Sequence, residues 1–171
     1  MTRDEMFEAA FAIVEHLMLK DGRMNPFFLT ATESGKRRFY GVDGMFMQSD
    51  QTKDMLVAMV RQQFAEAGVC LYAYASEIWM HREPARPGET KEQLIARARA
   101  EAERRGYSPQ EGCGRDEAVS IVVGDHAGTV GREWRIVRRE GRSKVKALEP
   151  GETEAVARSG RFADLVRKEM H

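Results

Sequence analysis

The stretch VCLYAYASEIWM, residues 69–80, is the most strand-like segment of this 171-residue chain. Its alternating residues divide into two sets, which are Leu71, Ala73, Ala75, Glu77 and Trp79 on one face and Tyr72, Tyr74, Ser76, Ile78 and Met80 on the other. Both faces carry few polar side chains. Because a strand that is apolar on both faces is typical of the interior of a sheet, the pattern predicts a central strand.

Two helices are predicted before this strand. Thr2 and Glu5 form a T-x-x-E capping box, and an apolar stripe at helical spacing follows until Gly22, which ends the helix. Ser49 is an N-cap candidate for a second helix that runs to residue 67 and stops at Gly68. The apolar face predicted for this second helix consists of Met55, Leu56, Met59, Val60 and Phe64.

The remaining strand signals are short and are joined by tight turns. Strands are predicted at 27–32, 38–40, 118–124, 132–139 and 144–148, with turns at Gly35, 125–128 and 140–141, and a last helix at 153–168. Short links imply antiparallel neighbours, because parallel strands need a long crossover. The sequence therefore predicts an α+β fold in two layers, with a mostly antiparallel sheet of about five or six strands and the helices packed on one face.

The chain length fits one α+β domain over residues 1–171. Proline and glycine interrupt the pattern after the central strand, and a second capping box at Thr90 and Gln93 begins a charged helix over residues 91–105. Its large apolar residues are Leu94 and Ile95. Residues 84–114 are therefore predicted to form a peripheral helical insertion.

Composition limits the classes of function. Hydrophobic residues make up 42% of the chain, and 27 basic residues balance 27 acidic ones, which argues against a surface built entirely for nucleic acid or membrane. The start has no signal-peptide pattern, and no window is apolar enough to span a bilayer. With two cysteines far apart in the sequence, the expectation is a cytoplasmic protein with free thiols.

Motifs for common catalytic and cofactor sites do not occur, so the sequence predicts no cofactor and no metal site, and favours a protein that is not an enzyme. Glu77 is the weak catalytic candidate, because a carboxylate within an apolar strand is costly unless it is paired or functional. The alternative is that Glu77 pairs with an arginine of a neighbouring strand. A metal-dependent hydrolase or nuclease could use Glu77, Asp125 and Lys144, although the close acid-x-lysine pattern is missing.

Residues 132–146 carry the clearest local charge, with seven basic residues against two acidic ones. Alternation places Arg135 and Arg138 on opposite faces of the ribbon, with Trp134 on the face of Arg138. Such a ribbon could follow a phosphate backbone or bind an acidic protein surface, or its charge could simply prevent aggregation at a sheet edge. The candidate binding residues are Arg135, Arg138, Arg139, Arg142 and Lys144.

The segments YAYASEIWM and DEAVSIVVGD resemble a pattern in uncharacterised bacterial and phage-encoded α+β proteins, in which a strand ending in S-E-x-W precedes an apolar strand. The resemblance covers about the middle third of the chain and implies no particular activity. The expected function is a small non-enzymatic interaction or regulatory protein of bacterial or phage origin that binds a protein partner. The alternatives are a nucleic-acid-binding protein that uses the basic ribbon and a metal-dependent hydrolase or nuclease around Glu77.

Overall fold

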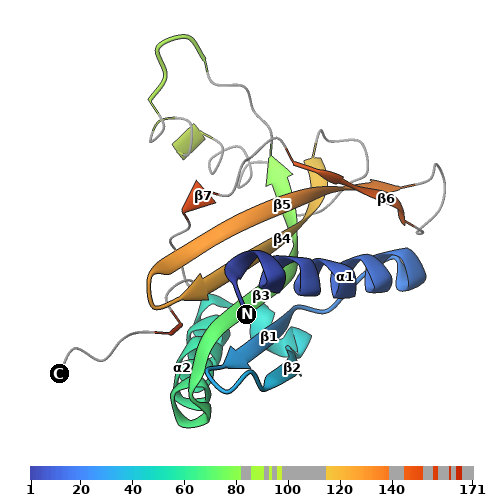
Figure 1. Cartoon of the computed structure of the whole chain (residues 1–171). Helices are drawn as coiled ribbons and strands as arrows, with labels where there is room; N and C mark the ends of the chain where they lie inside the picture. Colours follow the sequence, from blue (N-terminus) through green and yellow to red (C-terminus); the bar gives the residue numbers. More distant parts are fainter. Residues whose placement is uncertain are drawn as a thin grey trace. The chain divides into compact units, whose positions relative to one another are not determined.

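A computed structural model describes residues 1–81, 86–90, 93, 96–97, 115–138, 145–151, 156–157, 162 and 165–166 (Figure 1). The chain divides into two compact units. The first comprises Met1–Ile78 with Ala118–His171, and the second comprises Trp79–Glu117.

The first unit is an open antiparallel sheet with two helices packed against it. The elements of the chain in order are α1 (Arg3–Asp21), β1 (Phe27–Thr32), β2 (Arg37–Gly41), the short 3-10 helix η1 (Gly44–Met47), α2 (Asp50–Ala67), β3 (Val69–His81), β4 (Arg115–Asp125), β5 (Gly128–Arg138), β6 (Val145–Pro150) and β7 (Val156–Ala157). The end of β3 from Trp79 and the start of β4 up to Glu117 belong to the second unit. The strand order is β2-β1-β3-β4-β5-β6, and β7 pairs with β5. The predicted α+β class and mostly antiparallel sheet are confirmed.

The predicted helix ends are also confirmed. Thr2 and Glu5 form the reciprocal capping box of α1, and Gly22 ends the helix in the left-handed conformation with φ 74°. Ser49 caps α2 through the backbone N–H of Thr52, and Gly68 ends that helix with φ 63°. These ends depend on local chemistry, which is why a sequence pattern is sufficient to locate them.

The prediction that both helices pack on one face of a two-layer fold is wrong. The core around α1 includes Leu71, Ala73 and Ala75 of β3, whereas the core around α2 includes Tyr72 and Tyr74 of the same strand. Successive side chains of a strand point to opposite faces, so the two helices cover opposite faces of the sheet (Figure 1). The physical reason is that β3 is apolar on both faces, and both faces need a cover.

The predicted buried face of α2 needs a correction. Leu56, Val60 and Phe64 are buried as predicted. Met55 and Met59 are instead 54% and 46% exposed, and Val57 is buried in their place. The buried face of α2 therefore includes Leu56 and Val60 together with Val57, and not together with Met55 and Met59.

The predicted last helix, residues 153–168, is wrong where the structure describes that range. Val156–Ala157 is the strand β7, which pairs with β5 at Val130 and Gly131. Leu165 and Val166 are buried in the core beside α2. Of the residues described in this range, Val156–Ala157 thus add a strand beside β5, and Leu165 and Val166 cover the sheet on the side of α2.

Two tyrosines of β3 fix this C-terminal segment. The hydroxyl of Tyr72 donates to the carbonyl of Phe162 at 3.1 Å and accepts from the backbone N–H of Leu165 at 3.4 Å. The ring of Tyr74 stacks on that of Phe162, with centroids 4.4 Å apart. Burial raises the pKa of Tyr74 to about 12, since a phenolate would lose its hydration there.

The second unit contains the predicted charged helix in part. Thr90 and Gln93 form the expected capping box through reciprocal backbone contacts, and Ala96 and Arg97 are helical. Arg97 pairs with Glu89 at 2.8 Å. The rest of residues 91–105 lies outside the described residues. The peripheral insertion at 84–114 stays a prediction.

A glycine in β4 is required by close packing against Tyr72. A Cβ added at Gly124 would lie 2.5 Å from atoms of the Tyr72 ring, which is fully buried and held by its hydroxyl. We expect Gly124→Ala to lower the free energy of unfolding by about 1–3 kcal/mol in chemical denaturation. Gly44→Ala is the matched control, because a Cβ at Gly44 meets nothing within 4 Å, and it should change stability by less than about 0.5 kcal/mol. Equal effects of the two substitutions would contradict this packing argument.

Candidate functional site

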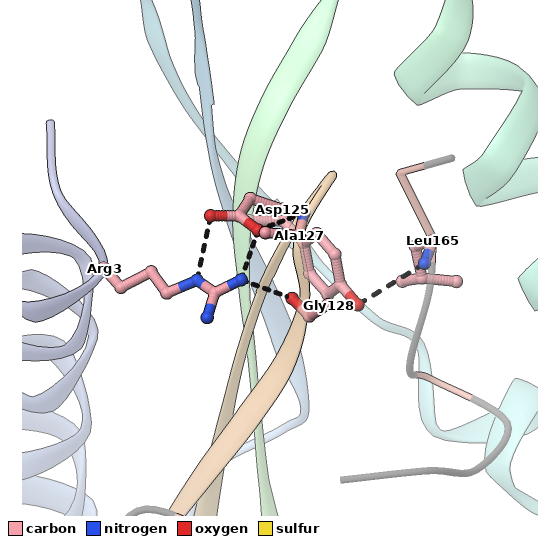
Figure 2. A network of polar contacts seen from close by, with 6 residues as sticks. Arg3, Asp125, Ala127, Gly128 and Leu165 are labelled. Atoms are coloured by element: carbon pink, nitrogen blue, oxygen red, sulfur yellow. Dashed lines mark hydrogen bonds and ion pairs between the residues drawn. The ribbon is translucent and has the colours of Figure 1, made fainter. Parts of the chain in front are cut away.

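An arginine at the start of α1 binds the turn between β4 and β5 (Figure 2). Arg3 Nε donates to Asp125 Oδ2 at 2.8 Å, and Nη2 donates both to the other carboxylate oxygen and to the carbonyl of Gly128. The backbone N–H of Ala127 donates to Asp125 Oδ1 at 2.7 Å. The hydrogen bonds from Arg3, opposed by partial burial and assisted by the Ala127 N–H, lower the pKa of Asp125 from its ordinary value. Asp125 thus joins α1 to the sheet.

Glu77, the candidate catalytic residue, contacts the connection between α1 and β1. Its Oε1 accepts the backbone N–H of Met24 at 2.5 Å, and its side chain is partly buried. Arg138 of β5 donates to the carbonyl of Gly22 in the same connection at 2.8 Å. Glu77 therefore has a structural contact, and its catalytic role stays a prediction.

Several side chains of the basic ribbon, residues 132–146, contact other residues of the chain. Arg132 donates to Asp4 at 2.7 Å and lies over the ring of Phe7, 4.3 Å from its centroid. Trp134 stacks on Phe11 of α1 at 4.7 Å, so this face of β5 lies against the helix. On the opposite face, Arg135 is 3.9 Å from Glu149 of β6.

The five candidate binding residues therefore have different positions. Arg138 shares the α1-facing side of β5 with Trp134, as the alternation predicts, and contacts Gly22. Arg135 is exposed on the other side. Arg139, Arg142 and Lys144 lie outside the described residues. The described arginines of the ribbon each have an interaction within the chain, so they do not form a row of unoccupied cations.

The edge strand β2 is a feature that the sequence analysis did not identify as a site. Thr32 donates its backbone N–H to Lys36 O at 3.1 Å, and Val42 donates to Pro26 O at 2.7 Å. Antiparallel ladders alternate between residues that face the neighbouring strand and residues that face away. These two hydrogen bonds show that Lys36 and Val42 face β1. By the alternation, the backbone N–H and C=O groups of Arg37, Phe39 and Gly41 point away from β1.

The outer edge of β2 pairs with no strand in the described part of the chain. Phe39 is 53% exposed, although its ring lies 5.1 Å from that of Phe27. Lys36, Arg37 and Arg38 are exposed, and no acidic residue lies between 36 and 41. We name Lys36–Gly41 with its outward backbone groups the β2 edge. Its sequence signal is a short strand with two arginines directly after a tight hairpin turn.

Within the ranges that the structure describes, no three His, Cys, Asp or Glu side chains gather in an arrangement that could hold a metal ion. None of the helices in these ranges is long and apolar enough to cross a membrane.

Comparison with protein-family models, with curated proteins and with solved structures gives no significant match. The resemblance of residues 72–80 and 116–125 to bacterial and phage proteins stays an expectation from the sequence.

The contact between Arg3 and Asp125 should stabilise the fold in a pH-dependent way. Replacing Asp125 with Asn leaves Arg3 without its charged acceptor and should lower the free energy of unfolding by about 1–3 kcal/mol at neutral pH. Because the folded state lowers the pKa of Asp125, the stabilisation is present above the ordinary carboxyl pKa of about 3.9 and is lost as the pH falls through the lowered value. The difference between wild type and variant, measured by urea unfolding, should shrink below about pH 4.

The control for this prediction is Asp4→Asn. The side chain of Asp4 is 76% exposed and pairs with Arg132, so its loss should cost less than about 1 kcal/mol. A larger loss for Asp4→Asn than for Asp125→Asn would contradict the ranking of the two ion pairs.

Glu77→Gln tests the contact with Met24. An amide oxygen accepts a hydrogen bond more weakly than a carboxylate, so the free energy of unfolding should fall by about 1–2 kcal/mol. Glu15→Gln changes the same group at an exposed position of α1 and should have little effect. If chemical denaturation shows no loss of stability for Glu77→Gln, the carboxylate does not stabilise the connection between α1 and β1.

Proposed function

We propose that the chain is a protein-binding domain and that the β2 edge takes up an extended, acidic segment of a partner as an additional strand. One observation carries this proposal. The backbone groups of Arg37, Phe39 and Gly41 face outward at the end of the sheet, and no described strand pairs with them.

An added strand fits the polar groups of this edge. Each outward residue presents one N–H and one C=O, and a peptide in an extended conformation satisfies such groups in register. Main-chain hydrogen bonds supply affinity in this mode of recognition, and alternate side chains supply specificity. The exposed ring of Phe39 offers an apolar contact to a side chain on the face of α1.

The positive charge of the β2 edge favours an acidic partner segment. Lys36, Arg37 and Arg38 place positive charge on both faces of the edge, with no acid among residues 36–41. Carboxylates of an incoming strand would form favourable cross-strand pairs with these cations. A second copy of the chain is a poorer partner, because pairing two β2 edges would bring two sets of three cations together.

The basic ribbon supports a nucleic-acid function less well. Arg132 and Arg138 have acceptors within the chain, and Arg135 lies near Glu149. A phosphate backbone would have to compete with these contacts. Nucleic-acid binding is therefore the alternative that the experiment has to separate from strand addition.

The experiment compares two labelled peptides of about eight residues, one alternating Glu with Val and the other alternating Lys with Val. Fluorescence anisotropy should show saturable binding of the Glu-Val peptide and weaker binding of the Lys-Val peptide. The affinity for the Glu-Val peptide should fall with added salt, because exposed charges are screened within about 10 Å at 0.1 M ionic strength. A generic DNA duplex, measured in parallel, should not bind at about 150 mM salt.

Variants at one position separate backbone pairing from side-chain contact. Phe39→Pro removes an outward N–H, which an edge strand tolerates without losing its inner ladder, and should abolish binding of the Glu-Val peptide. Phe39→Ala keeps the N–H and should only weaken binding. Thermal unfolding checks that both variants fold.

A modified peptide gives a test that does not depend on the fold of a variant. Methylation of alternate backbone nitrogens along the pairing edge of the Glu-Val peptide should abolish its binding, because those donors are lost. The proposal is overturned if the methylated peptide binds as well as the unmodified one, if the Lys-Val peptide binds equally, or if the DNA duplex binds with micromolar or tighter affinity in place of the peptide.

A further inference from the structure

A cleft of about 970 Å³ opens on the α2 side of the first unit. It lies between residues 32–38 of the hairpin, the C-terminal end of α2, the turn between β4 and β5, and residues 165–166. A volume of this order is at the upper end of what small-molecule sites offer. The cleft is separate from the outward backbone groups of the β2 edge, since Arg37 and Phe39 do not line it.

The wall of the cleft combines an apolar part with a cationic part. Its buried apolar residues are Phe64, Val69, Leu165 and Val166. Its basic residues are Lys36, Arg38, Arg61 and His126, which come from three separate segments of the chain. An apolar surface bordered by a few convergent polar groups is typical of a ligand site.

The cations of the cleft are available to a ligand. The side chains of Lys36, Arg38 and Arg61 are exposed, and among the described residues none of them has an ion pair or hydrogen bond. By contrast, Glu66, one of the two acids in the wall, accepts from Gln62 at 2.9 Å.

The same surroundings limit the charge of the ligand. Glu33 and Glu66 offset part of the positive charge, and the carbonyl end of α2 adds a partial negative charge at Ala67 and Gly68. A polyanion such as nucleic acid would meet these groups as well as the cations. A single anionic group next to an apolar body matches the cleft better.

We propose that this cleft binds a small amphipathic anion, with its apolar body against Phe64 and Leu165 and its carboxylate, sulfonate or phosphate near Lys36, Arg38 and Arg61. Partial burial of the apolar body contributes to the affinity, and the exposed cations orient the ligand and exclude amines. The proposal does not depend on strand addition at the β2 edge.

The first experiment titrates the whole protein with anilinonaphthalene sulfonate, a fluorescent amphipathic anion. The dye should bind at one site, and octanoate should displace it while octylamine, which has the same chain and the opposite charge, should not. Arg61→Gln should weaken dye binding by about tenfold. Arg23→Gln removes an equally exposed arginine outside the cleft and should leave binding unchanged.

Cys70 gives a second readout that needs no change in the cleft. It lines the cleft and is partly buried, with its thiol donating to the carbonyl of Ala31 at 3.5 Å. In a Cys113→Ser background, the reaction of Cys70 with a maleimide should be slowed by octanoate and not by octylamine.

These measurements decide the proposal and keep it separate from the β2 edge. Phe39→Pro should abolish peptide binding and leave dye binding intact, whereas Arg61→Gln should weaken dye binding by about tenfold and leave peptide binding intact. The cleft proposal is overturned if octylamine displaces the dye as well as octanoate, if Arg61→Gln and Arg23→Gln behave alike, or if octanoate leaves the labelling rate of Cys70 unchanged.

Discussion

The burial of β3 on both faces is the constraint on which the rest of the first unit depends. Ala73 and Ala75 are small and fully buried, which brings the apolar stripe of α1 close to the backbone of the strand. Tyr72 and Tyr74 on the other face are large, so α2 and the C-terminal segment cover a thicker layer of side chains. Because one strand needs both covers, the helices occupy opposite faces, and the C-terminal segment completes the second face through the hydroxyl of Tyr72.

Local chemistry explains which parts of the fold the sequence predicts. The capping contact of Thr2 and the terminating contact of Gly22 each involve a residue three or four positions away, so the sequence is sufficient to predict both. The sequence does not predict the buried side of α2, because Met55 and Val57 flank the same apolar stripe. Only the sheet face against which α2 packs determines which of the two is buried. The β2 edge depends on the spatial order of strands, which periodicity does not encode. Contacts such as Glu77 with Met24 also join positions that no local pattern relates.

The two sides of the sheet use basic residues differently. Along β5, Arg132 and Arg138 complete contacts to α1 and to the connection that follows it, and β6, Gly151 and β7 occupy the outer edge of the strand. Along β2, the cations have no such acceptors in the part of the chain that the structure describes, and the outer edge has no strand beside it. A count of charge along the sequence favours the first region, whereas the geometry favours the second. Unused hydrogen-bonding capacity, more than charge density, distinguishes a surface that can receive a partner.

The contact between Arg3 and Asp125 has a consequence for biosynthesis. It joins residues 122 positions apart, and the core under α1 includes side chains of β4 and β5. Since a chain is synthesised from its N-terminus at about 5–20 residues per second, α1 leaves the ribosome several seconds before the strands that bury it. During that interval Met6, Phe7 and Val14, which are buried in the folded chain, have no core to pack against. α1 therefore precedes by about a hundred residues the strands β4 and β5 that complete its core.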